Sequence, residues 1–285
     1  MVLVTGASGH LGRRVVELLV AKGVPVVAAT RDPAKLAGLS GVEVRRLDFD
    51  DADSLGTAFR GIERALIVST DRLDVPRSEQ HGRAIAAAAK AGVRHLVYTS
   101  FANPTETSAV GLARDHRLTE AALVASGVGF TSLRNQLYAD LLLQSLPQAL
   151  ASGQWYTARG AGAVAYVTRE DCAQAAAGAL ADGFVGTRYL TISGPEALTG
   201  DAIAAIAAEV AGRPLAHVSI PADGLKAGMV GAGLPEGIAD LLVSFEVAAA
   251  RGEMSEVTGH VATLSGRPPI SVRAFLQAHA AALRG

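Results

Sequence analysis

Cysteine is nearly absent from this sequence. Its 285 residues include a single one, Cys172. A framework of disulfide bonds within the chain is therefore excluded, and a reducing compartment, the cytoplasm, is expected. Cys172 lies in a helical pattern of small apolar residues, where a buried thiol is more common than a reactive nucleophile. We expect it to be structural.

An excess of charge of either sign is also missing. The chain has 26 Lys and Arg against 27 Asp and Glu, a formal net charge of −1. No basic surplus is available to neutralise a phosphate backbone, so nucleic-acid binding is not expected. Hydrophobic residues make up 49% of the chain and charged residues 19%, which excludes the composition of a disordered protein.

Long hydrophobic runs are lacking as well. Charged residues or glycines interrupt each apolar stretch before it reaches ~18 residues, so no transmembrane helix is expected. Met1 is followed at once by Val2 to Thr5, without the charged segment and cleavage site of a secretory leader. The histidines form no His-Glu-x-x-His motif and there is no Gly-x-Ser-x-Gly motif, so no metal site and no hydrolase elbow are expected.

Short apolar runs alternate with longer helical patterns over the first half of the chain. This alternation is typical of βαβ units, and it predicts an α/β fold with a doubly wound parallel sheet whose first half has the order 3-2-1. The predicted helices in this half span 10–21, 76–91 and 111–126, and the predicted strands span 2–5, 24–30, 42–47, 64–69, 94–100 and 128–133. In the second half, helices are predicted over 138–151, 169–181, 199–211 and 235–250, with Thr199 as the cap of the third, and a strand over 188–192.

The first predicted strand runs into a glycine turn with the spacing Gly-x-x-Gly-x-x-Gly. The first glycine allows a tight turn, the second lets a pyrophosphate approach the backbone, and the third lets the helix pack on the strand. The following helix N-terminus offers free N–H groups to phosphates. This context predicts a Rossmann-type dinucleotide site formed by Gly6, Ala7, Ser8, Gly9, His10, Leu11 and Gly12.

The end of the second predicted strand carries a basic residue where NAD-binding folds usually carry an acid. Arg31 fits a 2′-phosphate in bidentate fashion, and Lys35 adds charge one turn later. We therefore predict NADP(H) as the cofactor, with Asp32 serving the ribose of NAD as the alternative.

The ends of the next two predicted strands carry candidates for the adenosine. Asp48 and Phe49 are candidates for contact with the adenine, and Ser69 and Thr70 for contact with the adjoining ribose. Each is equally explained as a turn residue or a cap.

Several motifs together resemble the NmrA-like, atypical short-chain dehydrogenase/reductase family. They are the glycine turn, Arg31 to Lys35, Tyr98-Thr-Ser100, Leu133-Arg-Asn135, Arg169-Glu-Asp171 and Ile192-Ser-Gly-Pro195. Within that family the chain resembles the bacterial type 2 NAD(P)H:quinone oxidoreductases at His116, Glu120 and Tyr138. The resemblance spans nearly the whole chain. It implies a Rossmann core over 1–135, to which 165–193 returns, and a smaller C-terminal substrate lobe formed by 136–164 and 194–285.

Typical reductases of this superfamily use Tyr-x-x-x-Lys, and none of the five tyrosines here has a lysine four residues later. By resemblance, Leu112 and His116 occupy those two positions, so alcohol–ketone chemistry by the usual relay is not expected. A quinone needs less help because it is already electrophilic. The predicted residues near the nicotinamide are Ser100, His116, Asn135 and Tyr138, with capping, packing, turn and core roles as their respective alternatives.

His116 is expected to contact the ribose hydroxyls or to donate to the substrate oxygen, since histidine titrates near neutrality. Ser100 is a candidate for contact with the ribose or the substrate, and Asn135 for holding the carboxamide of the cofactor. The resulting hypothesis is an NADPH-dependent oxidoreductase that passes hydride directly to a quinone or similar electron-poor small molecule. One alternative is a non-enzymatic NADP(H) redox sensor that acts through protein partners, and another is a reductase of imines or activated alkenes. The alanine-rich helices fit a homodimer interface and burial against the sheet equally well.

Overall fold

The computed structural model describes residues 1–70 and 75–284, and its main element in this part of the chain is a parallel sheet of seven strands. Their order is β3-β2-β1-β4-β5-β6-β9, which is the doubly wound arrangement of a Rossmann fold and confirms the predicted fold class and the 3-2-1 first half. The strands are β1 (Val2–Val4), β2 (Val26–Thr30), β3 (Glu43–Arg46), β4 (Arg64–Ile67), β5 (His95–Phe101), β6 (Gly129–Asn135) and β9 (Thr187–Ile192).

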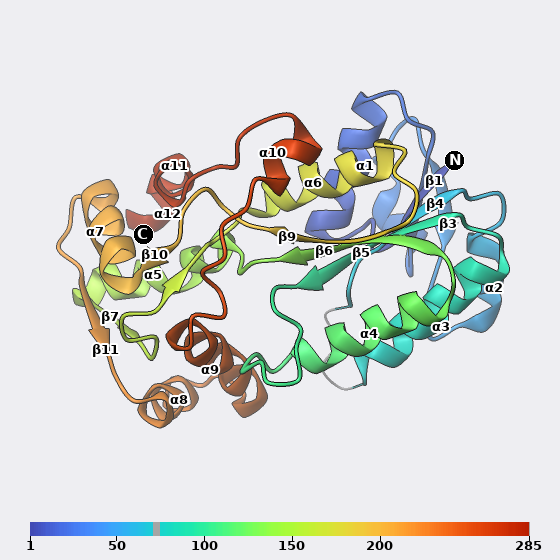
Figure 1. Cartoon of the computed structure of the whole chain (residues 1–285). Helices are drawn as coiled ribbons and strands as arrows, with labels where there is room; N and C mark the ends of the chain where they lie inside the picture. Colours follow the sequence, from blue (N-terminus) through green and yellow to red (C-terminus); the bar gives the residue numbers. More distant parts are fainter. Residues whose placement is uncertain (71–74, 285) are drawn as a thin grey trace.

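Helices cover both faces of this sheet (Figure 1). On one face lie α1 (His10–Ala21), α6 (Arg169–Ala181) and α10 (His260–Ser265), and α6 packs against both of the others. On the opposite face lie α2 (Ala52–Ala58), α3 (Arg77–Lys90) and α4 (Ala113–Ala125). Burial on both faces explains why the central strands β1, β2 and β4 are mainly apolar, without polar alternation: Leu3, Val4, Val27 and Leu66 are all fully buried.

A smaller unit lies at the carboxyl ends of the strands, on the left of Figure 1. Its hydrophobic cluster includes Leu146, Trp155, Ile203, Phe245 and Leu276. It contains the short helix η2 (Ala139–Leu141), α5 (Leu142–Ser152), α7 (Gly200–Ala211), α8 (Ala222–Gly231), α9 (Glu236–Ala250), α11 (Val272–Ala278) and α12 (Ala280–Arg284). It also contains the strand pairs β7 (Gln154–Thr157) with β11 (Ala216–Ser219) and β8 (Ala163–Val164) with β10 (Leu198–Thr199). The carboxyl ends of the strands therefore face a second layer of structure, and a ligand bound there is enclosed from two sides.

The alanine-rich helix α6 is buried within the chain. Ala173, Ala176 and Ala179 are fully buried in the cluster between the sheet, α1 and α10, to which Val261 of α10 also belongs. Cys172 is 1% exposed and has no disulfide partner, as predicted. Small side chains allow α6 to approach its neighbours closely: a Cβ added at Gly178 would lie 2.0 Å from the carbonyl oxygen of Leu264.

The helix expected over 138–151 begins later than predicted. Tyr138 has extended backbone angles and pairs with Val167 in an isolated parallel bridge. The backbone N–H of Ala139 donates to the carbonyl oxygen of Val167 at 2.9 Å. This pairing between distant segments fixes Tyr138 three residues after the end of β6, where it lines the cavity at the carboxyl ends of the strands. The predicted cap of α7 is confirmed, because Thr199 Oγ1 accepts from the backbone N–H of Ala202 at 3.3 Å.

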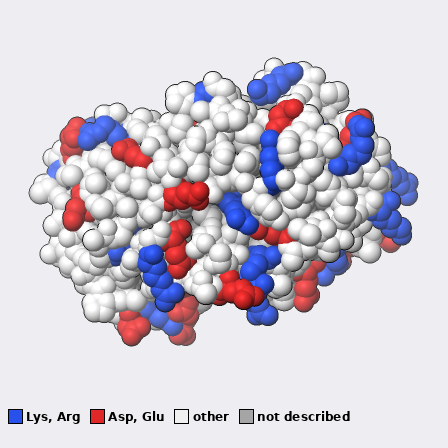
Figure 2. Space-filling model, viewed as in Figure 1, with Lys and Arg blue, Asp and Glu red and all other residues white. Residues whose placement is uncertain are grey.

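No helix in the described residues combines the length and the apolarity needed to cross a membrane. Basic and acidic side chains are interspersed over the face drawn in Figure 2, in line with the balanced composition.

Candidate active site

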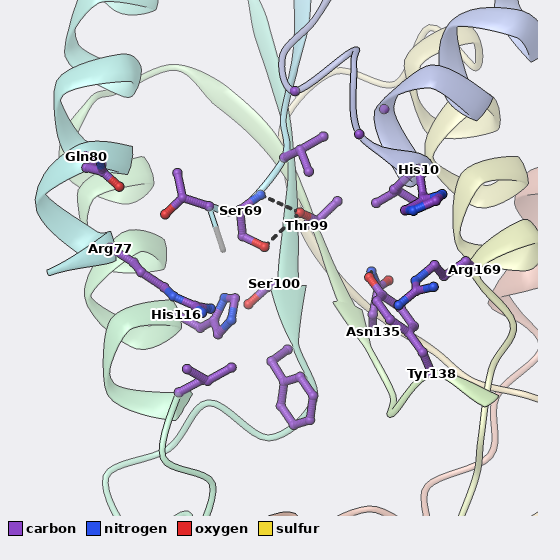
Figure 3. A pocket seen from close by; sticks show the side chains of 18 of the residues that line it. His10, Ser69, Arg77, Gln80, Thr99, Ser100, His116, Asn135, Tyr138 and Arg169 are labelled. Carbon is purple, nitrogen blue, oxygen red and sulfur yellow. Dashed lines mark hydrogen bonds between the residues drawn. The ribbon is translucent and has the colours of Figure 1, made fainter. Parts of the chain in front are cut away.

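A cavity of about 490 Å³ opens where the carboxyl ends of the sheet strands meet the smaller unit. Its lining comes from the glycine turn, from the ends of β2, β4, β5 and β6, from α3 and α4, and from α9 of the smaller unit. Figure 3 shows Arg77, Ser100 and His116 on one wall and His10, Asn135, Tyr138 and Arg169 on the other. Ligands of doubly wound sheets bind at this edge, and the volume suits a small-molecule site.

The glycine turn has the geometry that a phosphate loop needs. Gly6 has φ +61°, a left-handed conformation that favours glycine. A Cβ at Gly12 would lie 2.3 Å from the carbonyl oxygen of Gly6, so this position admits only glycine without movement of the backbone. The Ser8 and Thr30 hydroxyls are 2.8 Å apart and join the turn to β2. Ala7 is buried behind the loop, while the other six residues of the turn line the cavity.

Arg31 lines the cavity directly after β2. Asp32, the alternative ribose ligand, is engaged elsewhere: its Oδ1 accepts from the backbone N–H of Ala34 at 3.1 Å and caps the short helix η1 (Pro33–Leu36). Lys35 lies on η1 and is not among the lining residues. The end of β2 thus brings an arginine to the cavity wall, and the acid beside it is used as a helix cap.

The residues predicted for the adenosine half lie together on the next strand ends. Asp48, Phe49, Ser69 and Thr70 all line the cavity. One carboxylate oxygen of Asp48 also accepts from the backbone N–H of Asp50 at 3.1 Å, so a turn role and a lining role coexist in this side chain. The Ser69 backbone N–H donates to Thr99 Oγ1 at 2.8 Å, which holds the β4 end against β5 (Figure 3).

Several buried polar atoms on the cavity wall have no protein partner in the described part of the chain. They are Thr70 Oγ1, Gln80 Oε1, Asn135 Oδ1 and Gln136 Oε1. Buried polar groups are almost always hydrogen-bonded in folded proteins. Unsatisfied acceptors gathered in one cavity are what a wall complementary to a polar ligand would have.

Ser100 is less available than predicted. Its hydroxyl donates to Glu120 Oε1 at 2.9 Å, and the same carboxylate accepts from Ser132 at 2.7 Å and from Arg134 at 2.7 and 3.0 Å. Ser100 still lines the cavity, but its proton is committed to Glu120. It can offer a ligand only the lone pairs of its oxygen.

His116 is buried, 4% exposed, and lines the cavity from α4. Its Nδ1 lies 2.7 Å from the Tyr98 hydroxyl. Burial lowers its pKa to about 3, and the nearby positive charge of Arg77 acts in the same direction. The premise that His116 titrates near neutrality is therefore wrong. The ring is neutral at pH 7, and it can donate a hydrogen bond only through the N–H of one tautomer.

Asn135 and Tyr138 face the cavity from the opposite wall. The Asn135 amide donates to the Tyr138 hydroxyl at 3.2 Å, which leaves Asn135 Oδ1 free to accept. The Arg169 guanidinium lies over the Tyr138 ring, 5.5 Å from its centroid. Burial raises the pKa of Tyr138, so its phenol stays protonated.

Sequence reasoning missed part of the wall. Arg77 and Gln80 lie in the first turns of α3 and belong to no motif, and Arg169 belongs to the Arg169-Glu-Asp171 motif but was not predicted as a site residue. The apolar end of the cavity is lined by Phe101, Leu112, Leu137, Leu141 and Phe245. The Phe101 and Phe245 rings are stacked, with centroids 5.5 Å apart. Phe245 comes from α9, 144 positions along the chain from Phe101, so no local pattern could have predicted this pair.

Buried neutral histidines predict acid lability. Burial lowers the pKa of His95 from 6.5 to about 4, so between these values the unfolded chain binds a proton that the folded chain does not. Stability is then complete above pH 6.5 and falls as the pH drops toward 4, by ~1.4 kcal/mol per pH unit per histidine. Urea unfolding at pH 6.5 and 4.5 should show that His95→Gln reduces this slope; an unchanged slope would contradict it.

Comparison with known proteins identifies the family of this chain. A family model described as the NmrA-like family matches residues 1–263. The chain belongs to the NmrA-like family. The resemblance inferred from the sequence motifs is thereby confirmed, and the NmrA-like match spans both the sheet and most of the smaller unit.

Two curated relatives of this NmrA-like chain are similar to it over nearly their whole length. It is 35% identical to quinone oxidoreductase 2 of Escherichia coli over 273 residues, 94% of each chain. It is 30% identical to the NAD(P)H azoreductase of Xenophilus azovorans over 285 residues, 99% of each.

Two solved structures are also similar to the NmrA-like chain. The NADPH complex of the E. coli NADPH-dependent quinone oxidoreductase has a TM-score of 0.92 at 35% identity, covering 98% of this chain and 99% of that one. The NADP(H) complex of Citrobacter sp. triphenylmethane reductase has a TM-score of 0.89 at 34% identity, covering 98% and 100%.

Proposed function

We propose that this protein is an NADPH-dependent reductase that passes hydride directly to a quinone or a similar electron-poor acceptor without a Tyr-x-x-x-Lys pair. The observation that carries the proposal is one continuous cavity with two chemically different ends. One end has the glycine turn and Arg31, and the other has the stacked Phe101 and Phe245 rings beside His116. Relatives named as an NADPH-dependent quinone oxidoreductase and as a triphenylmethane reductase in complex with NADP(H) support it.

The residues present fit NADPH. Gly6 and Gly12 leave room for phosphate close to the backbone, and the α1 N-terminus adds free N–H groups. Arg31 would hold the 2′-phosphate, because Asp32 is occupied as the η1 cap. The unpartnered oxygens of Thr70 and Asn135 can accept from ribose hydroxyls and from a carboxamide. Lys35 is proposed to add positive charge near the same end.

Cofactor choice should depend on Arg31. Because a charged hydrogen bond contributes ~1.5–3 kcal/mol, Arg31→Asp should weaken NADPH binding at least about tenfold and spare NADH. Calorimetric titration of both nucleotides measures this. The control is Arg213→Asp, which makes the same charge change at an exposed position after α7. Equal losses for NADPH and NADH in Arg31→Asp would refute the 2′-phosphate role.

We call the apolar end of the cavity, with Phe101, Phe245 and His116, the acceptor end. It can orient a planar quinone ring and stabilise the negative charge that develops on the quinone oxygen. When bound, NADPH would supply a hydride, which carries two electrons and one hydrogen and reduces the quinone to a hydroquinone monoanion; solvent would supply the one proton that completes the hydroquinone as it leaves the cavity. The leucine and phenylalanine side chains exclude water from the ring. Arg77 and His116 lie side by side on the wall (Figure 3), where positive charge and an N–H donor favour the developing oxyanion.

The direct test is NADPH oxidation followed by absorbance with a panel of benzoquinones, naphthoquinones, azo dyes and activated alkenes. We expect turnover with quinones and lower rates with NADH. Binding of NADPH with no turnover on any acceptor would overturn the reductase and favour the sensor alternative. Turnover confined to alkenes would overturn the quinone assignment alone.

A further inference from the structure

A line of hydrogen bonds runs through the interior from the end of β4 to the cavity. The Thr70 backbone N–H donates to His81 Nε2 at 3.0 Å. His81 Nδ1 lies 2.9 Å from Thr119 Oγ1 and 3.3 Å from the Tyr98 hydroxyl oxygen. The Tyr98 hydroxyl lies 2.7 Å from His116 Nδ1. Of the three aromatic side chains in this line, only His116 lines the cavity.

The direction of the first two hydrogen bonds follows from what each group can do. A backbone N–H can only donate, so His81 Nε2 is a bare acceptor. Burial lowers the pKa of His81 to about 4, so the ring is neutral at pH 7 and its one proton is on Nδ1. The Thr119 hydroxyl donates to the Asp115 carbonyl oxygen at 2.7 Å, so its oxygen accepts from His81.

These assignments leave the Tyr98 hydroxyl two possible acceptors, Thr119 Oγ1 and His116 Nδ1. His81 Nδ1 carries a proton and cannot accept one from the Tyr98 hydroxyl. Burial raises the pKa of Tyr98, so the phenol keeps its proton. The shortest contact of that hydroxyl is with His116 Nδ1, at 2.7 Å, and donation there makes Nδ1 the acceptor. The ring proton of His116 is then on Nε2, the other ring nitrogen.

We propose that this chain of hydrogen bonds holds His116 in the Nε2–H tautomer and directs that N–H to an oxygen of the acceptor. Tyr98 and His81 are then positioning residues, which act through His116. The donor role rests on the proposed function, whereas the tautomer does not. A neutral N–H donor stabilises an oxyanion without transferring its proton, so it works over a wide range of pH.

The tautomer can be measured in the intact protein. In protein labelled with ¹⁵N-histidine at pH 7, long-range proton–nitrogen correlation spectra distinguish a protonated from a bare ring nitrogen. The His116 signals are assigned by their loss in His116→Gln. We expect a protonated Nε2 and a bare Nδ1. A protonated Nδ1, or an imidazolium ring, would overturn the proposal even if no variant of Tyr98 folds.

Tyr98→Phe tests the positioning role. It removes the donor to Nδ1, so His116 should exchange between tautomers and kcat for a quinone should fall about tenfold, the equivalent of one hydrogen bond. The KM for NADPH should stay within about twofold. Tyr189→Phe makes the same chemical change in β9, outside the cavity, and should leave both the tautomer and kcat unchanged.

If the Tyr98 hydroxyl has only a structural role, Tyr98→Phe will lower the unfolding temperature but leave the His116 tautomer and kcat as in the wild type. That result would overturn the proposal. If the wild type oxidises no NADPH with any quinone, the proposed function fails separately, and the nitrogen spectra still decide whether the hydrogen-bond chain sets the tautomer.

Discussion

Gly12→Ala should abolish nucleotide binding and lower the free energy of unfolding by about 3 kcal/mol, the upper end of the usual cost of overpacking. The added Cβ would lie 2.3 Å from the carbonyl oxygen of Gly6 and 2.7 Å from its carbonyl carbon. Both atoms belong to the backbone of a turn that Gly6 holds in a left-handed conformation, so neither can move without displacing α1 from β1. Urea unfolding and calorimetric titration of NADPH measure the two losses.

Substitutions at two other glycines distinguish an effect on folding from an effect on nucleotide binding. Gly9 has φ −83° and a Cβ there would meet only the Gly6 carbonyl oxygen, at 3.4 Å. Gly9→Ala should therefore fold normally and bind NADPH at least about tenfold more weakly, because the methyl group occupies the approach of the pyrophosphate. Gly38→Ala, which meets nothing within 4 Å, should change neither property. Normal NADPH affinity in Gly12→Ala would refute the phosphate role of the turn.

Glu246→Ala should cost about 3–5 kcal/mol of stability, because it leaves a buried arginine without its counter-ion. The Arg159 guanidinium is 2% exposed and donates two hydrogen bonds to the Glu246 carboxylate, at 2.8 and 2.5 Å. Glu246 is on α9, next to Phe245 of the acceptor end. Loosening α9 should therefore raise the KM for the quinone and leave NADPH affinity unchanged, which steady-state kinetics and calorimetry can separate.

The double variant Arg159→Met with Glu246→Leu is the matched control, since replacement of a buried ion pair by apolar side chains is often tolerated. It should recover most of the lost stability. Glu236→Ala removes an exposed carboxylate from the same helix and should leave the unfolding temperature unchanged. Similar losses of stability in Glu236→Ala and Glu246→Ala would contradict the role of Glu246 as the counter-ion of buried Arg159.

Local patterns were sufficient for the sheet and for the position of the glycine turn and Arg31 at the cavity. Strands such as Val26–Thr30 are apolar throughout because both faces are covered, and that signal is continuous in the sequence. The glycine turn and Arg31 are also adjacent to a strand end, so their place in the fold follows from the strand order. The short α2, α8 and α10 to α12 carry weaker signals and were not predicted.

The properties of the acceptor end depend on contacts that no local pattern contains. His116 belongs to an ordinary polar helix sequence, and its pKa is lowered only because β5 and α3 enclose it. The Ser100 proton is committed to Glu120, 20 positions away. Phe245 reaches Phe101 only after the chain has crossed the sheet and formed the smaller unit. His116 and Ser100 could be predicted as candidate residues, whereas their protonation and availability, and the contribution of Phe245, could not.

The stacked pair Phe101 and Phe245 joins the end of a central strand to a helix of the separate C-terminal layer. The nucleotide contacts proposed for the glycine turn and Arg31 lie outside that joint. Substitutions in α9 can therefore reshape the opening for oxidants while the reductant remains held as before. Such an arrangement lets one scaffold diversify its choice of electron acceptor through drift in a single helix.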